Sequence, residues 1–297
     1  MNNDWISSLT RLDGAYAPTT IRGYRSDFLN FSQWCASNAL AALPAEVSTV
    51  CAYIDAHAGI LKPSTLKRRL AAIRMIHSLL DLGDPTLSRD IKLALRRVMR
   101  QHPARPDQAL GITAERRDKL LAACDTNLKG LRDQALVSVG FDTLCRRSEL
   151  VALRIEDIEY DDDGTAKILV RRAKNDPVGQ GRIAHLSSRS IKLIEDWQDA
   201  AAFEEGPLIR PVRGDIAYPR HMASIIVSRV LKELSAKANF DEDAVSSVSG
   251  HSLRVGAAQS LVKMGYGLLP IMAAGGWRSA EVVARYVAHV ELNPWRD

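Results

Sequence analysis

Cysteine, long apolar runs and targeting signals are scarce or missing in this chain of 297 residues. Its 4 cysteines include no Cys-x-x-Cys pair and are too few for a disulfide scaffold, which predicts a reducing compartment such as the cytoplasm. The longest uncharged stretch, residues 28–45, contains Asn, Gln and Pro and is too polar to cross a bilayer. Because the amino-terminal residues lack a basic region followed by an apolar run, we expect no signal peptide and no membrane partner.

The motifs of nucleotide and metal cofactors are missing as well. The sequence has no Gly-x-Gly-x-x-Gly, no glycine-rich loop ending in Gly-Lys-Ser/Thr and no Gly-x-Ser-x-Gly elbow. Its 7 histidines show no His-Glu-x-x-His spacing. The acidic run at residues 161–164 lacks the ligand spacing of a calcium loop and is better explained as a turn entering a strand. We therefore expect neither a nucleotide cofactor nor a metal.

The positive charge lies in one part of the chain. The net charge is +5, with 14 basic and 9 acidic residues before position 111 and 26 of each after it. A basic excess confined to the first third indicates a polyanionic partner, most simply nucleic acid. The length corresponds to about two domains. Residues 101–107 contain two prolines and no apolar periodicity, which predicts an interdomain linker there.

Apolar residues at helical spacing predict three basic helices in the first third. One follows Pro18 and reaches Cys35, a second begins near Pro63, and a third covers residues 89–100. Basic side chains off the apolar stripes are candidates for contacts with DNA phosphates, with solvated helix surface as the alternative for any single one. The candidates on the first two helices are Arg22, Arg25, Lys67 and Arg68.

The rest of the chain has a helical pattern interrupted by a small sheet. Residues 111–150 and those after 188 are helical in pattern, with breaks at 205–207 and 275–276. Two short strands near residues 168–170 and 183–186 flank a turn-rich segment at 174–179. We therefore expect a mainly α fold with a small antiparallel β-sheet in the second domain.

A few polar residues in this second part are candidates for chemistry. His251 and Arg254 would share one face of a helix, where an imidazole beside a guanidinium favours an anion between them. For the two residues alone, a chance surface pair is the better explanation, because His-x-x-Arg is a common pattern. Arg146 lies in a segment expected to be helical, residues 142–150, and Lys174 lies in the expected turn. By default Trp277 is a core residue and Tyr286 a half-buried packing residue on one helix face with Val282 and Val283.

Taken in order, these signatures resemble the tyrosine recombinase (phage integrase) family. The resemblance rests on residues 249–258, on Ala274-Gly275-Gly276-Trp277 and on Tyr286. It extends through residues 142–158 and 172–174 and, more weakly, over the helical first third. By resemblance, Arg146 and Arg254 are the catalytic arginines and Tyr286 is the nucleophile. Lys174 is the hairpin lysine, and His251 is the histidine of the His-x-x-Arg pair. Trp277 is a hydrogen-bond donor to the phosphate, and Glu149 supports the site without reacting. Arg147 departs from the family pattern, in which an apolar residue is frequent, and Arg146 is chosen from its register with Ser148-Glu149-Leu150.

The chemistry that the resemblance implies suits these residue types. A tyrosine hydroxyl, with a pKa of ~10, needs cations or a base to attack a phosphodiester. Arginines can neutralise the oxygens of a pentacoordinate phosphate, a lysine can protonate the leaving 5′-oxygen, and a histidine can assist proton transfer at the tyrosine. Because a 3′-phosphotyrosine preserves the energy of the broken bond, rejoining requires neither ATP nor a metal.

The resemblance also implies an architecture and an assembly. Residues 1–106 would be a helical SAM-like core-binding domain and residues 107–297 the catalytic domain, and the two would clamp double-stranded DNA. Family members act as homotetramers on paired inverted-repeat sites through a Holliday junction, and we expect a monomer in solution. Two alternatives remain open at this stage: a type IB topoisomerase and a catalytically silent DNA-binding regulator.

Overall fold

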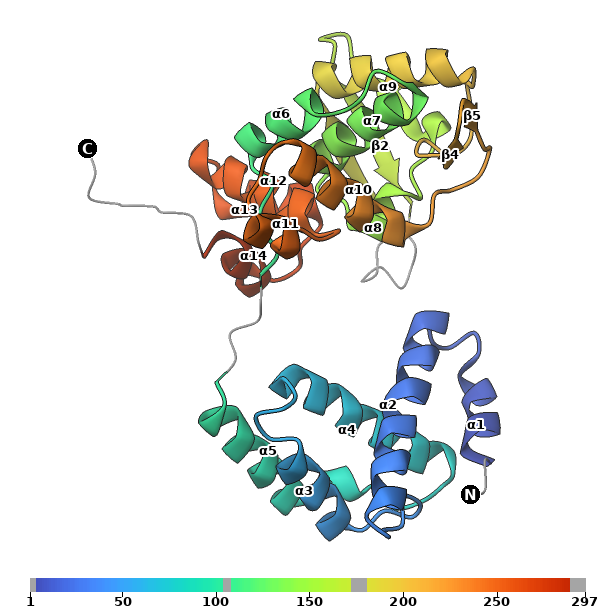
Figure 1. Cartoon of the computed structure of the whole chain (residues 1–297), viewed down its shortest axis with the longest axis vertical. Coiled ribbons are helices and arrows are strands. Elements are labelled where there is room, and N and C mark those ends of the chain that lie inside the picture. Colours follow the sequence, from blue (N-terminus) through green and yellow to red (C-terminus); the bar gives the residue numbers. More distant parts are fainter. Residues whose placement is uncertain (1–3, 104–107, 172–180, 289–297) are drawn as a thin grey trace, which may run out of the picture. The chain divides into compact units, whose positions relative to one another are not determined.

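The computed structural model describes residues 4–103, 108–171 and 181–288, and the chain divides into two compact units, Met1–Pro106 and Asp107–Asp297 (Figure 1). Helices dominate both units, and the strands form two small antiparallel sheets within the second. The fold class expected from the sequence is confirmed. Among the described residues, no helix is both long and apolar enough to span a membrane.

The first unit is a helical bundle around its own core. All three expected helices are present, and two of them begin at a proline, whose fixed φ suits a first helical turn. Phe28, Phe31, Tyr53 and Ile73 are fully buried between them. A further helix that we did not predict, α3, lies between α2 and α4 in the sequence. The elements are α1 (Asp4–Ser8), η1 (Leu9–Leu12), α2 (Pro18–Ser37), α3 (Val47–Ala56), α4 (Pro63–Leu79), η2 (Pro85–Leu87) and α5 (Arg89–Gln101).

The expected linker overlaps the end of this unit. Helix α5 continues to Gln101, one residue into the expected linker, and His102 and Pro103 are not helical. Residues 104–107 lie outside the described part of the chain.

The second unit builds most of its core from helices packed on a three-stranded sheet. Strands β1 (Ile158–Tyr160), β2 (Ala166–Val170) and β3 (Arg182–Leu186) form an antiparallel sheet in that order, with Ile168 opposite Ala184. The acidic run after β1 is a turn that leads to β2, as expected. The expected segment 174–179 lies outside the described residues, while β1 is an addition to the two strands that we predicted.

Two expectations for this unit are wrong in part. The chain after residue 188 is not wholly helical, because β4 (Val212–Arg213) and β5 (Ile216–Ala217) form a short hairpin. Residues 142–150 are not one helix, because α7 ends at Asp142 and α8 begins only at Arg147. The helices are α6 (Ala114–Ala122), α7 (Leu128–Asp142), α8 (Arg147–Leu150), η3 (Ile155–Asp157), α9 (Ser188–Ala201), α10 (Ser224–Lys237), α11 (Glu242–Ser247), α12 (Ser252–Lys263), α13 (Leu268–Gly275) and α14 (Ala280–Val287).

Candidate active site

Arg146 is presented by a turn between α7 and α8 and not by a helix. Leu144 has a left-handed backbone, with φ of 49°, and this conformation ends the helical path after α7. The buried carboxylate of Glu149 accepts hydrogen bonds from the Arg146 backbone N–H at 3.0 Å and from its Nη1 at 2.6 Å. Glu149 thereby caps α8 and orients the Arg146 guanidinium, whose side chain is 18% exposed.

Arg254 is the third residue of α12, and its side chain is buried. The residue is 1% exposed, and its Nη1 donates a hydrogen bond to the carbonyl of Leu144 in the turn before Arg146. Its Nε and Nη2 are buried and have no hydrogen-bond partner among the described residues. Burial, followed by the nearby Arg146 cation, lowers the pKa of Arg254 to about 10. Two unpartnered donors on a buried cation indicate a place for an anion.

Trp277 and Tyr286 continue from this guanidinium. The Arg254 Cζ lies 4.0 Å from the centre of the Trp277 ring, and the Trp277 and Tyr286 ring centres are 5.5 Å apart. Gly275 makes this packing possible, because a Cβ there would lie 2.0 Å from Cζ3 of the indole. Gly276 follows with a left-handed φ of 62° and turns the chain from α13 towards Trp277. The Trp277 indole therefore lies between the Arg254 guanidinium and the Tyr286 phenol and contacts both.

Tyr286 is held by backbone contacts on α14. Its carbonyl accepts hydrogen bonds from Nε2 of Gln108 at 2.7 Å and from Nε2 of Gln259, on α12, at 3.2 Å. Val283, one turn earlier on the same helix, is fully buried against the small core that contains Trp277. These contacts fix the part of α14 that carries the tyrosine.

His251 is the residue before α12 and not a member of the helix. Its backbone N–H donates to Oγ of Ser249 at 3.1 Å. Burial of the ring, and then the Arg254 and Arg147 cations, lower the pKa of His251, although the residue as a whole is exposed. At neutral pH this imidazole is therefore uncharged and able to accept a proton.

The two neighbouring arginines have different surroundings, and one expected residue cannot be placed. Arg146 is paired with Glu149, whereas the Arg147 side chain covers Gly250, where a Cβ would lie 2.7 Å from its Cδ. Lys174 lies outside the described residues. The structure thus brings Arg146, Glu149, His251, Arg254, Trp277 and Tyr286 into one region.

Sequence reasoning missed one partly buried cation beside this group. Arg182, the first residue of β3, is 11% exposed, and its Nη2 lies 3.9 Å from Oε2 of Glu149. An arginine at the start of a strand carries no local signal of burial, so only the tertiary structure could identify it.

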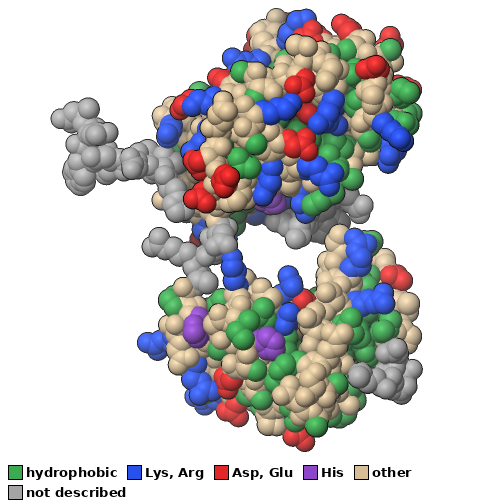
Figure 2. All heavy atoms as spheres, viewed as in Figure 1, with side chains coloured by type: hydrophobic (Ala, Val, Ile, Leu, Met, Phe, Trp, Pro, Cys, Tyr) green, Lys and Arg blue, Asp and Glu red, His purple; other side chains and the backbone are tan. Residues whose placement is uncertain are grey.

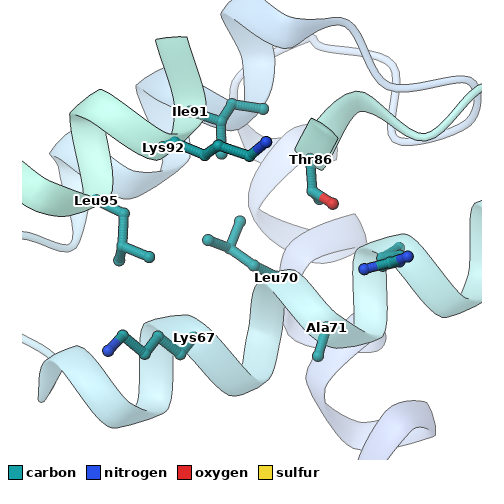
Figure 3. A pocket seen from close by; sticks show the side chains of 8 residues that line it. Lys67, Leu70, Ala71, Thr86, Ile91, Lys92 and Leu95 are labelled. Carbon is teal, nitrogen blue, oxygen red and sulfur yellow. The ribbon is translucent and has the colours of Figure 1, made fainter. Parts of the chain in front are cut away.

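The candidate DNA contacts all lie on exposed helix surface in the first unit. Arg22 and Arg25 project from α2 and Lys67 from α4. On the face shown in Figure 2, Lys and Arg side chains are interspersed with acidic and apolar ones in both units. Lys67 of α4 and Lys92 of α5 border an open hollow of about 220 Å³, which Leu70 and Leu95 help to line (Figure 3).

Arg68 has a second role that the sequence did not indicate. Its Nε and Nη2 donate to the two carboxylate oxygens of Asp27 at 2.6 and 2.8 Å, so this ion pair joins α4 to α2. Asp27 is 2% exposed, whereas the Arg68 side chain is 64% exposed. Arg68 therefore compensates a buried carboxylate in addition to any contact that it makes with DNA.

Residues 111–292 match the phage integrase family, and residues 4–81 match the phage integrase N-terminal SAM-like domain. The chain belongs to the phage integrase family. Its curated relatives include the integrase/recombinase xerD homolog of Selenomonas ruminantium, 28% identical over 96% of this chain and 86% of the relative. The recombinase cre of Escherichia phage P1 is 26% identical over 88% of this chain and 81% of the relative. The resemblance stated from the sequence is confirmed.

Solved structures show the fold of this chain in other proteins. The Tn1549 transposon integrase, in complex with circular intermediate DNA, aligns with a TM-score of 0.66 at 15% identity, over 96% of this chain and 94% of that one. XerH recombinase bound to palindromic difH, in a post-cleavage complex, aligns with a TM-score of 0.65 at 15% identity, over 91% and 76%. At these identities the likeness establishes the shared fold.

Proposed function

We propose that this protein is a site-specific DNA recombinase that cleaves and rejoins DNA through a 3′-phosphotyrosine at Tyr286. The observation that carries the proposal is the buried Arg254 guanidinium. Two of its donors have no partner in the described part of the chain, and it stacks on Trp277 beside that tyrosine. A DNA phosphate supplies the anion that those donors lack, and it would lie within reach of the tyrosine hydroxyl.

In the proposed reaction the cations act on the phosphate and the histidine on the tyrosine. Arg254 and Arg146 donate to the non-bridging oxygens, whose charge grows as phosphorus becomes pentacoordinate. Glu149 keeps the Arg146 guanidinium oriented, so that little reorganisation is needed when the charge develops. Trp277 can donate its indole N–H to the same phosphate.

Two proton transfers complete the proposed step. The Tyr286 oxygen attacks phosphorus and the bond from phosphorus to the 5′-oxygen breaks. Neutral His251 accepts the tyrosine proton, and Lys174 supplies the proton that the leaving 5′-oxygen takes up. Rejoining runs the same step in reverse, with the 5′-hydroxyl as nucleophile.

We assign different tasks to the two units. Residues 1–106 would bind the duplex as a core-binding domain and residues 107–297 would carry the chemistry, with double-stranded DNA clamped between them. The basic excess of the first third and its match to the SAM-like domain support this division. We further propose a homotetramer on paired inverted-repeat sites, assembled from monomers and acting in the cytoplasm.

The test is covalent trapping on a suicide substrate. The protein first selects its binding sequence from a random duplex library, and a nick near the cleavage point then prevents religation. Denaturing gels should show a protein–DNA adduct for the wild type and none for Tyr286→Phe, whose binding to the same duplex should persist.

Tyr266→Phe is the matched control. Tyr266 lies in the turn after α12 and is 51% exposed, so its removal should leave the adduct intact. An adduct that survives Tyr286→Phe and disappears with Tyr266→Phe would place the nucleophile on the other tyrosine.

A further inference from the structure

Arg182 joins three segments of the site through one guanidinium. Its Nη2 donates to the carbonyl of Thr143 at 2.7 Å and to Sγ of Cys145 at 3.4 Å, both in the turn that presents Arg146. Its Nη1 donates to the carbonyl of Ala274 at 2.9 Å, near the end of α13 and just before the turn to Trp277. β3, to which Arg182 belongs, begins shortly after the segment that contains Lys174.

The surroundings of Arg182 suit a buried guanidinium in this position. Gly276 leaves room for it, because a Cβ at that residue would lie 2.8 Å from Cδ of Arg182. Glu149, 3.9 Å away, supplies the opposite charge, and the same carboxylate orients Arg146. Arg182 thus shares its counterion with a candidate catalytic arginine.

This arrangement has a cost that packing alone does not explain. Nε of Arg182 is buried and has no partner among the described residues. An apolar side chain of similar size would avoid that desolvation cost but could not donate to two carbonyls on separate segments. The planar fork of the guanidinium holds both carbonyls at once, which a lysine ammonium at one point cannot do.

We infer that Arg182 is a positioning residue for DNA cleavage, which sets the Arg146 turn and the Trp277 turn at their working separation and ties both to β3. The inference rests on the proposed function. Arg182 acts through Arg146 and Trp277 and is not assigned a contact with the reacting phosphate. A displacement of about 1 Å in such groups can reduce a rate by about 100-fold, so one guanidinium can have a large effect.

The experiment measures the rate constant of adduct formation in single turnover at saturating suicide substrate, below the unfolding temperature of every variant. We expect Arg182→Gln to slow cleavage about 10- to 100-fold, with the Kd for DNA changed less than about threefold. Arg182→Lys should fall between Arg182→Gln and the wild type, because its ammonium can keep only one of the two carbonyl contacts. A lysine variant as fast as the wild type would overturn the bridging role.

Arg210→Gln is the matched control for loss of a buried arginine. Arg210 is 7% exposed, donates to the carbonyls of Pro207 and Glu205, and stacks over Phe203 at 3.7 Å, with none of these partners in the candidate site. Its replacement should lower the unfolding temperature but leave the cleavage rate within about twofold of the wild type. An equal loss of rate in both variants would show a general structural effect and overturn the inference.

A double-mutant cycle separates positioning from structural support. If Arg182 acts in part through Arg146, then Arg182→Gln should cost clearly less in an Arg146→Ala background than in the wild type, because neighbours that share a network are not additive. If the fold-loss of cleavage rate in the double variant equals the product of the two single losses, Arg182 does not act through Arg146. If the wild type itself forms no adduct, the proposed function fails. If it does and Arg182→Gln is equally fast, only the present inference fails.

Discussion

At the residue scale, we expect the burial of the Arg254 cation to lower the stability of the protein in exchange for the role proposed for it in DNA cleavage. Its Nε and Nη2 are removed from water without partners among the described residues, and burial lowers its pKa to about 10. Replacing a buried ion pair with apolar residues of similar volume is often neutral or stabilising by about 1–4 kcal/mol, and we expect the same for a buried cation whose removal leaves no buried carboxylate alone. If this cation binds a DNA phosphate, as proposed, then its burial should lower the free energy of unfolding when no DNA is bound.

The first prediction follows from that trade. Arg254→Met should leave the free energy of unfolding unchanged or raise it by up to about 4 kcal/mol. It should also reduce adduct formation by at least about 100-fold, the scale of losing one preorganised donor to a developing oxyanion. Urea unfolding and the trapping assay measure the two quantities on the same preparation.

Arg132→Met is the control for Arg254→Met. Arg132 is buried to a similar degree but is paired with buried Asp133 at 2.7 Å, so its removal should cost about 3–5 kcal/mol by leaving that carboxylate alone. A comparable destabilisation by Arg254→Met would mean that Arg254 is a structural residue already satisfied in the protein without DNA.

A buried histidine should make stability depend on pH. Nε2 of His77 accepts from the backbone N–H of Ala45 at 2.9 Å, and its Nδ1 donates to the carbonyl of Ile73 at 2.8 Å. Burial lowers the pKa of His77, so the folded chain holds the ring neutral while the unfolded chain protonates it near pH ~6.5. Its contribution is thus present above that pH and is lost as the pH falls.

The measurement is the difference in unfolding free energy between pH 7.5 and 5.5, for the wild type and for His77→Gln. The wild type should lose up to about 1.4 kcal/mol per pH unit below the unfolded pKa from this group, and the variant should lose correspondingly less. Equal pH slopes for the two proteins would contradict the assignment, because every other titrating group is common to both.

At the element scale, α2 and α4 share an apolar core and are also joined by the ion pair of Arg68 with Asp27, whose cation belongs to the candidate DNA-binding surface. Arg68→Ala removes the partner of buried Asp27 and should cost about 1–3 kcal/mol in the free energy of unfolding. Arg22→Ala, Arg25→Ala and Lys67→Ala should each change it by less than about 0.5 kcal/mol. Chemical unfolding of the four variants tests this separation.

DNA binding by the same variants tests the candidate surface. Each residue that contacts a phosphate should lower the slope of log K against log salt by ~1 when replaced by alanine. Since Arg68→Ala also perturbs the fold, the comparison must be made well below its unfolding temperature. Unchanged binding in all four would remove the surface from the proposed interface while leaving the candidate active site untouched.

How far the sequence could predict the structure also differs between elements. The helices α2 and α4 were predictable because apolar periodicity agreed with a proline at the first turn of each. The turn before Arg146 was not, because Leu144 takes a left-handed backbone without being glycine. The strands β4 and β5 are two residues long, too short to show a period.

Within the site, the sequence identified candidate polar residues but not the contacts that hold them in place. The resemblance to a family pointed to Arg254, Trp277 and Tyr286, which the structure then brings into one stack. Nothing local marks Arg182, whose carbonyl partners at 143 and 274 are far away in the chain. Long-range contacts of this kind depend on the packed structure and have no periodicity to detect.

At the scale of the whole molecule, the proposed recombinase differs from a topoisomerase in exchanging strands between two DNA sites and not relaxing one duplex. A phosphotyrosine intermediate serves a recombinase and a type IB topoisomerase equally well. The distinction therefore depends on how several chains and two DNA sites assemble, which the chemistry of one site does not determine. Plasmids that carry one copy, two copies or no copy of the selected sequence separate the two functions.

We expect recombination only on the plasmid with two copies: deletion when the copies are in direct orientation and inversion when they are opposed. The reaction should proceed with EDTA present and without ATP. In the proposed mechanism the bond to Tyr286 stores the energy that rejoining needs, and the cations of the chain stabilise the transition state. Gel analysis of plasmid topology and restriction pattern reads both activities in one reaction. Relaxation of the plasmid without a site, at a rate similar to that of the others, would favour a topoisomerase. A reaction that EDTA stops and Mg²⁺ restores would instead show that the chain's own cations are not sufficient for the transfer.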